Sequence, residues 1–270
     1  MVSTIVPALL LPGAALLPED EKGINETYRG ALETQTGKTF AYVKLLDAKQ
    51  LINELVSSVL GRTLGLLMPT AFIVLVSRDD YPDSAFLATH GLDKVLAFGV
   101  ESVGYPDLKR RMKVSGDLAV EELLRTWAGW CEAMLFDEWI ANGDRNAGNV
   151  LVGGPGEVWL IDHGNAFTGP NWVPLDLDPS VAVQNEIARV VVPRLGLPDR
   201  YRALHRSQAF SVDCGKLDTE EVIKESFVAA FVSQEEIEAL RAFIAKRVGE
   251  LVRLTSVRLG LPVLLILLCL

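Results

Sequence analysis

Short apolar runs separated by turn residues fill most of the first hundred positions and predict a β-sheet. Residues 27–33 and 38–45 have a strand pattern, and the turn between them ends in glycine, as hairpin turns favour. The β-branched run at residues 70–77 predicts a buried strand. The apolar runs at residues 85–91 and 94–100 are expected to be strands as well. This part of the chain therefore predicts a β-rich unit.

Helical periodicity marks one segment of that unit and much of the remaining chain. Apolar side chains repeat at helical spacing in residues 48–63 and, most strongly, in residues 118–142. Residues 219–229 and 234–259 also predict helices. Residues 165–200 contain five prolines and few clear elements. The whole pattern predicts an α+β fold.

The change from strand patterns to helix patterns predicts two lobes. A β-rich N-lobe is expected over residues 1–100 and a mainly helical C-lobe over residues 101–258. An apolar tail, residues 259–270, follows. Only about ten residues come after Gly260, whereas a spanning helix needs roughly twenty. The tail is expected to be a buried segment, and the alternative is a hydrophobic tail that docks on a membrane or a partner.

Composition and charge limit the classes of function. The net charge of −9 and the pI near 5.0 argue against a nucleic-acid binder, which normally has a basic face. The three cysteines form no C-x-x-C pair, so a disulfide framework and a zinc site are not expected. A reducing cytoplasm fits this cysteine usage. The apolar start of the chain lacks the positive charge of a signal peptide, so we expect a cytoplasmic protein.

Three polar residues at kinase spacing lie in residues 136–167, FDEWIANGDRNAGNVLVGGPGEVWLIDHGNAF. Asn149 follows Asp144 after five positions, as in the D-x-x-x-x-N of a kinase catalytic loop, and Asp162 follows thirteen positions later. Asp144 is expected to orient or deprotonate the attacking hydroxyl. Asn149 and Asp162 are expected to bind Mg²⁺ against the nucleotide phosphates.

A predicted hairpin connects these residues. Residues 149–152 and 157–161 are expected to be its two strands, which bring Asn149 and Asp162 to the same edge. Asp, Asn and Gly also build ordinary turns. For GDRNAGN alone, an ordinary turn is a competitive alternative to a kinase catalytic loop. The helix before the loop and the hairpin after it occur in the order of a kinase, which favours a nucleotide-dependent phosphotransferase.

Nucleotide-binding residues are expected in the N-lobe and at its end. Lys44 is a lone lysine in an apolar run and is expected to bind the α- and β-phosphates, with ordinary strand alternation as the alternative. Glu54, on the helix at 48–63, is expected to be the ion-pair partner of Lys44 rather than an exposed helix glutamate. Glu101 opens the connector at 101–109, whose backbone is expected to meet adenine.

The sequence contains no G-x-G-x-x-G phosphate loop. Gly23 and Asn25 are the nearest candidates for binding the phosphates, together with Thr27 and Gly30, and they give a weak signal. A backbone-amide loop of another shape can still bind phosphates. These residues are therefore retained as cofactor-binding candidates.

A basic cluster interrupts the otherwise acidic chain. It consists of Lys109, Arg110, Arg111 and Lys113. A solvated basic turn is the favoured interpretation. The alternative is a contact with phosphate or with an acidic substrate beside the active cleft.

The catalytic segment resembles the HipA-like kinase family and, more distantly, the phosphatidylinositol 3/4-kinases, which share a G-D-R-H-x-x-N loop and a later I-D aspartate. Residues 51–69, LINELVSSVLGRTLGLLMP, also resemble the family's N-E-x-x-x-x-x-L-G-x-x-x-G-L-x-x-P helix. The similarity covers about residues 20–170. It implies a two-lobed, atypical protein-kinase-like fold with ATP and Mg²⁺. For HipA itself it implies Ser/Thr phosphorylation of a protein substrate and a toxin–antitoxin role with an antitoxin-like partner.

One departure from the family loop affects the expected activity. Asn146 stands where the family has His, and Asn cannot take up a proton near neutral pH. If that His assists hydroxyl activation in the lipid kinases, this chain is a poorer lipid kinase or a slower enzyme. Arg145 and Asn146 are grouped with Asp144 in the catalytic set, and Arg145 is expected to hold the Asp144 loop or the activation segment.

Three functions remain open at this point. The first is a HipA-like kinase that transfers the γ-phosphate of ATP to a protein Ser/Thr. The second is a lipid or small-molecule kinase, which the apolar tail supports and Asn146 opposes. The third is a nucleotide-binding pseudokinase that acts as an interaction or toxin-regulating module. The intact set of Asp144, Asn149 and Asp162 opposes this third function.

Overall fold

The first part of the chain forms a six-stranded sheet. The computed structural model describes residues 5–18, 24–116, 118, 120, 123 and 126–262. The strand order is β1-β5-β6-β4-β3-β2, and β1 also pairs with β3, so the sheet curls back on itself. The strands are β1 Ile5–Leu10, β2 Ala15–Leu16, β3 Thr27–Thr34, β4 Gly37–Lys44, β5 Ala71–Ser77 and β6 Lys94–Glu101.

Of the five strands predicted in the first hundred residues, four are confirmed as β3, β4, β5 and β6, and the fifth is wrong. Residues 85–91 contain helix α2, Ala85–His90, instead of a strand. The Ser84 hydroxyl accepts a hydrogen bond from the Leu87 N–H, and Gly91 ends the helix in the left-handed conformation. These capping signals outweigh the apolar pattern. The structure also contains strands β1 and β2, which were not predicted. Prolines interrupt the apolar run that contains them, and proline is unfavourable in a strand.

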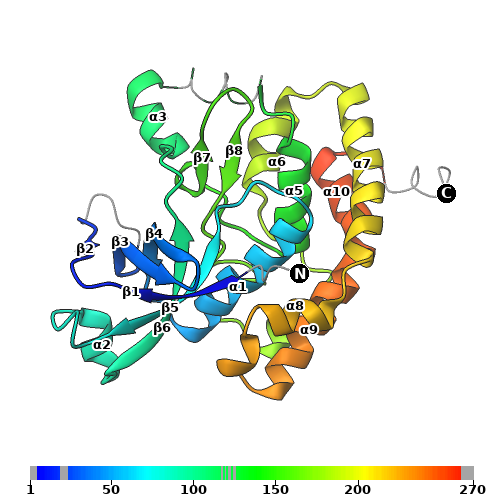
Figure 1. Ribbon diagram of the computed structural model, residues 1–270. Coiled ribbons are helices and arrows are strands. Elements are labelled where there is room, and N and C mark those ends of the chain that lie inside the picture. The colour runs from blue at the N-terminus through cyan, green and yellow to red at the C-terminus, as the bar shows by residue number, and fades with distance from the viewer. Residues whose placement is uncertain are drawn as a thin grey trace.

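Helix α1, Ala48–Thr63, confirms the predicted helix and lies between the strands and the later helices (Figure 1). All residues from 51 to 61 are buried. The apolar side chains of α1 belong to the hydrophobic core that continues into the helical part of the chain. Because the helix is buried all round, its polar residues Asn53 and Glu54 require partners inside the protein.

Helices dominate the second part of the described chain, beside a small two-stranded sheet (Figure 1). This hairpin, β7 Val150–Val152 with β8 Val158–Leu160, confirms the prediction. The helices are α3 Leu108–Ser115, α5 Trp130–Trp139, α6 Glu186–Val191, α7 Leu197–Gly215, α8 Thr219–Glu225, α9 Gln234–Arg247 and α10 Leu251–Leu259. The chain thus has a mixed α+β fold, with strands mainly in its N-terminal part and helices in its C-terminal part.

Two long helices predicted from periodicity are divided in the structure. Residues 118–142 do not form one helix, because residues 127–129 leave the helical conformation before α5 begins. Gly129, the residue before α5, favours this interruption since glycine weakens a helix interior. Residues 234–259 are divided into α9 and α10 by a 3₁₀ turn, Val248–Glu250. Periodicity identified the buried faces but not the interruptions.

Two further helices differ from the expectations. The basic cluster lies on helix α3, not on a turn, because Asp107 caps the helix by accepting the Arg110 N–H at 2.7 Å. Helix α7 begins at Leu197 with Pro198 in its first turn, inside the segment expected to hold few elements. Proline in that position is compatible with a helix start, so the proline-rich composition misled the prediction.

The start of the apolar tail is buried. Leu259 and Leu261 pack in the core, whereas residues 263–270, and with them most of the tail, lie outside the described residues. Within the described ranges, no helix combines the length and apolar character needed to cross a membrane.

Cys131 and Cys214 are buried free thiols, and burial raises the pKa of Cys131 to about 12.

Candidate active site

Lys44, Glu54 and Asp162 form an ion-pair cluster where the sheet, α1 and the β7–β8 hairpin meet. Lys44 Nζ lies 3.1 Å from Glu54 Oε1 and 3.0 Å from Asp162 Oδ1. The Glu54 side chain is 1% exposed, whereas the Asp162 side chain is 42% exposed. The predicted Lys44–Glu54 pair is therefore confirmed. Glu54 holds Lys44 from the interior, and Asp162 faces it from the accessible side.

The charges of this cluster stabilise one another. Burial alone would raise the pKa of Glu54, but Lys44 and the hydrogen bond from His163 hold that pKa below its usual value of 4.5. Burial alone would lower the pKa of Lys44, but the carboxylates of Asp162 and Glu54 raise it above its usual value of 10.5. Lys44 is therefore cationic and Glu54 anionic at neutral pH, as a phosphate-binding lysine and its counter-ion require.

The lowered pKa of Glu54 predicts an acid dependence of stability. A carboxyl group with a depressed folded-state pKa stabilises the fold above its unfolded pKa of about 4.5, and this stability is lost as the pH falls. Between pH 5.5 and 3.5, the free energy of unfolding of the wild type should therefore fall more steeply than that of Glu54→Gln. Urea unfolding at several pH values measures both slopes, and parallel slopes would contradict the prediction.

The catalytic-loop candidates lie close together. Asp144 Oδ1 accepts a hydrogen bond from Asn146 Nδ2 and its Oδ2 accepts one from Asn165 Nδ2, both at 3.0 Å. Asn149 Nδ2 donates to the Asp144 carbonyl at 2.6 Å, and the Asn146 side chain accepts the Gly148 N–H. The carboxylate of Asp144 is therefore held in one orientation. Sequence reasoning missed Asn165, although it lies three residues after Asp162.

Arg145 supports the loop from the interior and does not face the site. Its side chain is 0% exposed, and its guanidinium forms two hydrogen bonds with Asp137, at 2.8 and 3.0 Å. It also donates to the carbonyls of Asn149 and Ile161, one on each side of the hairpin. Arg145 is thus a positioning residue and not a catalytic one, which agrees with the expectation that it holds the Asp144 loop.

The oxygen atoms of Asn149 and Asp162 suit a magnesium ion. The Asn149 amide uses its nitrogen on Asp144, and one Asp162 oxygen pairs with Lys44. Within the described residues, Asn149 Oδ1 and Asp162 Oδ2 have no hydrogen-bond partner. No group of three His, Cys, Asp or Glu side chains in those residues forms a self-contained metal site. Two protein oxygens plus nucleotide phosphates match the way Mg²⁺ is usually bound.

Asn53 binds the segment that follows Asp162, a role that sequence reasoning missed. It is fully buried, and its side-chain oxygen accepts the Trp172 indole N–H at 2.9 Å. Its side-chain nitrogen donates to the carbonyls of Gly164, Ala166 and Gly169, at 2.8, 2.9 and 3.0 Å. The next residue, Glu54, accepts the His163 N–H at 2.9 Å. Two consecutive residues of α1 therefore hold the same segment.

This segment contains unusual backbone conformations that require such support. Asp162, Phe167 and Thr168 have positive φ values of 60°, 53° and 77°. A non-glycine residue in this region is strained and persists only when its surroundings hold it. Asn53 binds carbonyls on both sides of Phe167 and Thr168. The sequence signals were the place of Asn53 in the family's N-E motif and the occurrence of asparagine, a weak helix former, in the middle of α1.

Comparison with known proteins supports the kinase interpretation of this cluster. A family model described as HipA-like kinase matches residues 20–174, which is more than half of the chain. This chain belongs to the HipA-like kinase family. The resemblance inferred from the sequence is therefore confirmed, and the matched range contains Lys44, Glu54, Asp144 and Asp162.

Among solved structures, the HipA-like kinase described here is similar to the crystal structure of the Helicobacter pylori proinflammatory kinase CtkA. The TM-score is 0.57 at 14% sequence identity, and the alignment covers 95% of this chain and 98% of that chain. At this identity the likeness concerns the fold. A comparison with curated protein sequences gives no match.

The remaining cofactor-binding candidates of the HipA-like kinase lie outside the ion-pair cluster. The Glu101 N–H donates to the Thr70 carbonyl and the Ser102 N–H to the Phe40 carbonyl, both at 2.9 Å, so these two N–H groups already have partners within the protein. Asn25 lies just before β3, where its carbonyl accepts the Thr27 hydroxyl. Gly23 lies outside the described residues. Nucleotide contacts by these residues stay predictions.

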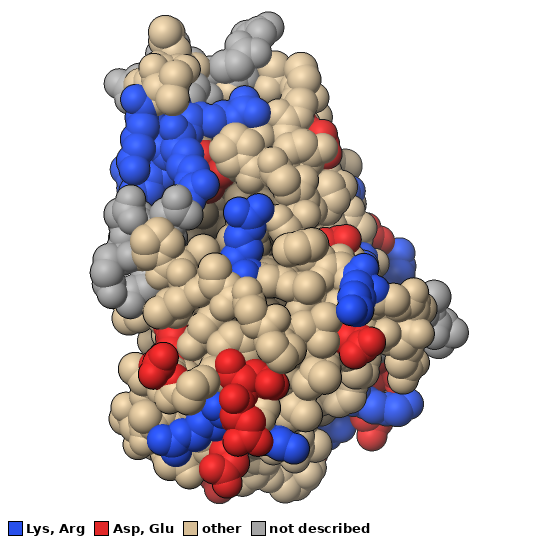
Figure 2. All heavy atoms as spheres, turned by 60° about the vertical axis from the view of Figure 1, so that its left-hand side comes forward, with Lys and Arg blue, Asp and Glu red and all other residues tan. Residues whose placement is uncertain are grey.

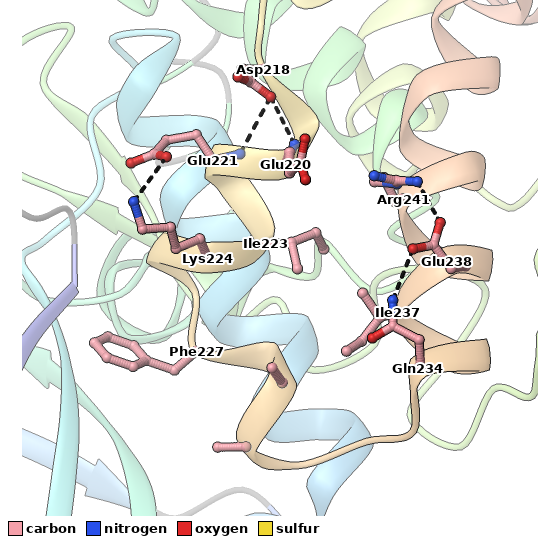
Figure 3. Close-up of a pocket in the computed structure, with 12 residues that line it drawn as sticks. Asp218, Glu220, Glu221, Ile223, Lys224, Phe227, Gln234, Ile237, Glu238 and Arg241 are labelled. Atoms are coloured by element: carbon pink, nitrogen blue, oxygen red, sulfur yellow. Dashed lines mark hydrogen bonds and ion pairs between the residues drawn. The ribbon is translucent and has the colours of Figure 1, made fainter.

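A separate groove of about 840 Å³ lies between α8 and α9 of the HipA-like kinase (Figure 3). Ile223 and Ile237 lie between the two helices, and acidic side chains and their partners line the rim. Two ion pairs, Glu221–Lys224 and Glu238–Arg241, belong to that rim. None of the residues of the Lys44 cluster or the catalytic loop lines this groove, so it is not part of the active site.

Proposed function

We propose that this HipA-like kinase transfers the γ-phosphate of ATP, with Mg²⁺, to a Ser or Thr hydroxyl of a protein. The observation that carries the proposal is the cluster of Lys44, Glu54 and Asp162. In this proposal the strand-rich part, residues 1–100, and the helical part, residues 101–258, act as two lobes that hold ATP between them. The family membership supports a kinase, and the acceptor is our proposal.

The described side chains have distinct tasks in this mechanism. Lys44, held by Glu54, would bind the α- and β-phosphates. The Asp144 carboxylate, oriented by Asn146 and Asn165, would align the acceptor hydroxyl and take its proton during attack on the γ-phosphorus. Mg²⁺ bound by Asn149 and Asp162 would neutralise the negative charge that develops on the phosphates.

If a His at the position of Asn146 assists hydroxyl activation in the lipid kinases, Asn146 opposes the lipid alternative. The Asn146 amide donates to Asp144 Oδ1 and fixes the carboxylate, but it cannot exchange a proton with the acceptor. The lipid alternative depended on the apolar tail, most of which lies outside the described residues.

We further propose a cytoplasmic location and, by analogy with HipA, an antitoxin-like protein partner.

Replacing Asp144 tests this function. The change Asp144→Asn keeps the shape of the side chain but removes the proton acceptor, so phosphate transfer should fall by about 10²- to 10⁴-fold. Transfer from γ-labelled ATP with Mg²⁺ would be measured on the protein itself, on cell-extract proteins and in extracted lipid. Asp213→Asn, in an exposed ion pair of α7, is the matched control and should retain full transfer.

Each outcome of this assay decides between the functions. Label on protein that disappears in Asp144→Asn supports the protein kinase, and label in lipid supports the lipid kinase. Unchanged transfer by Asp144→Asn would refute the role of Asp144. Nucleotide binding without transfer to any fraction would refute the kinase proposal and favour the pseudokinase.

A further inference from the structure

Helix α3 is attached firmly to the catalytic hairpin. The residue before it, Asp107, forms a β-bridge with Leu151, and the Val152 N–H donates to the Pro106 carbonyl at 3.0 Å. Arg111 Nη2 donates to the carbonyls of Val152 and Gly153, at 2.7 and 2.8 Å. These bonds fix the helix relative to the strand that follows the catalytic loop.

Helix α3 also lies against the catalytic loop itself. It packs on the 3₁₀ turn Ala147–Asn149, which begins three residues after Asp144. Asn149 in that turn is one of the proposed magnesium ligands. Helix α3 as a whole is therefore held beside the loop that contains Asp144.

The open face of α3 is basic. Lys109, Arg110 and Lys113 are exposed, and Figure 2 shows Lys and Arg side chains gathered in one area at the upper left, at the height of α3. Arg110 pairs with Asp107 at 3.3 Å. In the described part of the chain, Lys109 and Lys113 have no carboxylate within ion-pair distance. This concentration of positive charge is unusual for a protein with a net charge of −9.

Among the described residues, most exposed cations of the later helices pair with a carboxylate, although Lys246 on α9 does not; α3 differs in placing two such lysines beside Arg110 on one helix face. On α6 to α10, exposed cations typically pair with a carboxylate three residues earlier, as in Glu186–Arg189, Asp199–Arg202, Asp213–Lys216, Glu221–Lys224, Glu238–Arg241 and Glu250–Arg253. The sequence places no carboxylate three residues before Lys109 or Lys113: those positions are occupied by Pro106 and Arg110. As far as the described residues show, the two lysines are therefore available to a partner.

We propose that the basic face of α3, formed by Lys109, Arg110 and Lys113, docks an acidic segment of the protein substrate next to its phosphoacceptor residue. The proposal rests on the proposed protein-kinase function and adds the chemistry of the substrate. Complementary charge at this position would orient the substrate toward Asp144 and increase its rate of association. An extended segment of a few residues spans the distance from a helix face to a neighbouring loop.

A charge reversal on α3 tests the proposal with defined peptides. The probes are Ser-containing peptides that differ only in their flanks, which carry glutamate, alanine or lysine. The double variant Lys109→Glu/Lys113→Glu should lower kcat/KM for the glutamate-flanked peptide by about 10-fold and leave the alanine-flanked peptide and the KM for ATP unchanged. Activity on the glutamate-flanked peptide should also fall as salt rises, because exposed charges are screened.

The matched control is Lys38→Glu/Lys94→Glu, which makes the same charge change at exposed positions of β4 and β6. This control should retain the preference for glutamate flanks. Equal activity of the wild type on all flanks would overturn the docking proposal and leave the kinase function standing. A raised KM for ATP in the α3 variant would also overturn it, because α3 would then serve the nucleotide.

A binding measurement separates this proposal from the proposed function. Fluorescence anisotropy with a labelled glutamate-flanked peptide would be recorded for the wild type, the α3 variant and the control variant. If no peptide is phosphorylated but the wild type binds the acidic peptide about 10-fold more tightly than the α3 variant does, docking stands and the kinase proposal fails. If all three proteins bind the peptide equally, docking fails whatever the transfer assay shows.

Discussion

Replacing Asp162 with alanine should lower ATP turnover by about 10³-fold or more, the scale of removing a key charged group from a transition-state site. The Asp162 carboxylate lies 3.0 Å from Lys44, and its other oxygen is available to a metal. The change therefore removes both a proposed magnesium ligand and one of the two counter-ions of Lys44. Turnover would be measured by formation of ADP from ATP at saturating Mg²⁺, which registers transfer of the γ-phosphate to an acceptor.

The design of this test separates catalysis from folding. Asp93→Ala, an exposed aspartate between α2 and β6, is the control and should retain turnover. Nucleotide binding in the absence of Mg²⁺ should persist in Asp162→Ala, because the Lys44–Glu54 pair at 3.1 Å remains. Retained turnover in Asp162→Ala would show that the metal assignment is wrong.

Replacing Arg145 with alanine should destabilise the protein by roughly 3–5 kcal/mol, the typical cost of leaving one partner of a buried ion pair alone. The side chains of Arg145 and Asp137 are both 0% exposed, and they share two hydrogen bonds. Activity should also be lost, because Arg145 binds the carbonyls of Asn149 and Ile161 beside the catalytic loop. Urea unfolding measures the change in the free energy of unfolding.

Two further variants make this stability prediction specific. Arg241→Ala breaks an exposed ion pair with Glu238 and should cost less than about 1 kcal/mol. The double change Asp137→Leu with Arg145→Met replaces the buried charges by apolar groups and should restore much of the stability but not the activity. A loss in Arg145→Ala no larger than that in Arg241→Ala would refute the structural role of the pair.

Local pattern was sufficient for the elements that carry the chemistry. Apolar runs bounded by turn residues predicted β4 and the β7–β8 hairpin, and period-3.6 spacing predicted α1, because helical spacing shows which side chains share a face. The D-x-x-x-x-N spacing, which is that of a kinase catalytic loop, placed Asp144 and Asn149 on one loop. The ion pair of Lys44 with Glu54 was also predictable, because a lysine in an apolar run needs a nearby counter-charge.

Local pattern failed where capping residues or chain breaks outweighed periodicity. Residues 85–91 have an apolar pattern that suits a strand, but Ser84 and Gly91 cap a helix there. The interruption at residues 127–129 divides a continuous helical pattern, because periodicity registers the buried face and not the continuity of the backbone. Strand β1 was not predicted, because prolines occur near the start of the chain. Pairing with both β5 and β3 stabilises this strand.

The sequence by itself determined the α+β class and the HipA-like resemblance, and it proposed Lys44, Glu54, Asp144 and Asp162 as site residues, because these inferences depend on patterns along the chain. Only the tertiary structure decided which groups meet across long separations. Asn53 and Trp172 bond across 119 positions, and the basic helix α3 comes to lie on the catalytic loop. Hydrogen bonding and packing between distant segments depend on the whole fold, so no local sequence pattern predicts them.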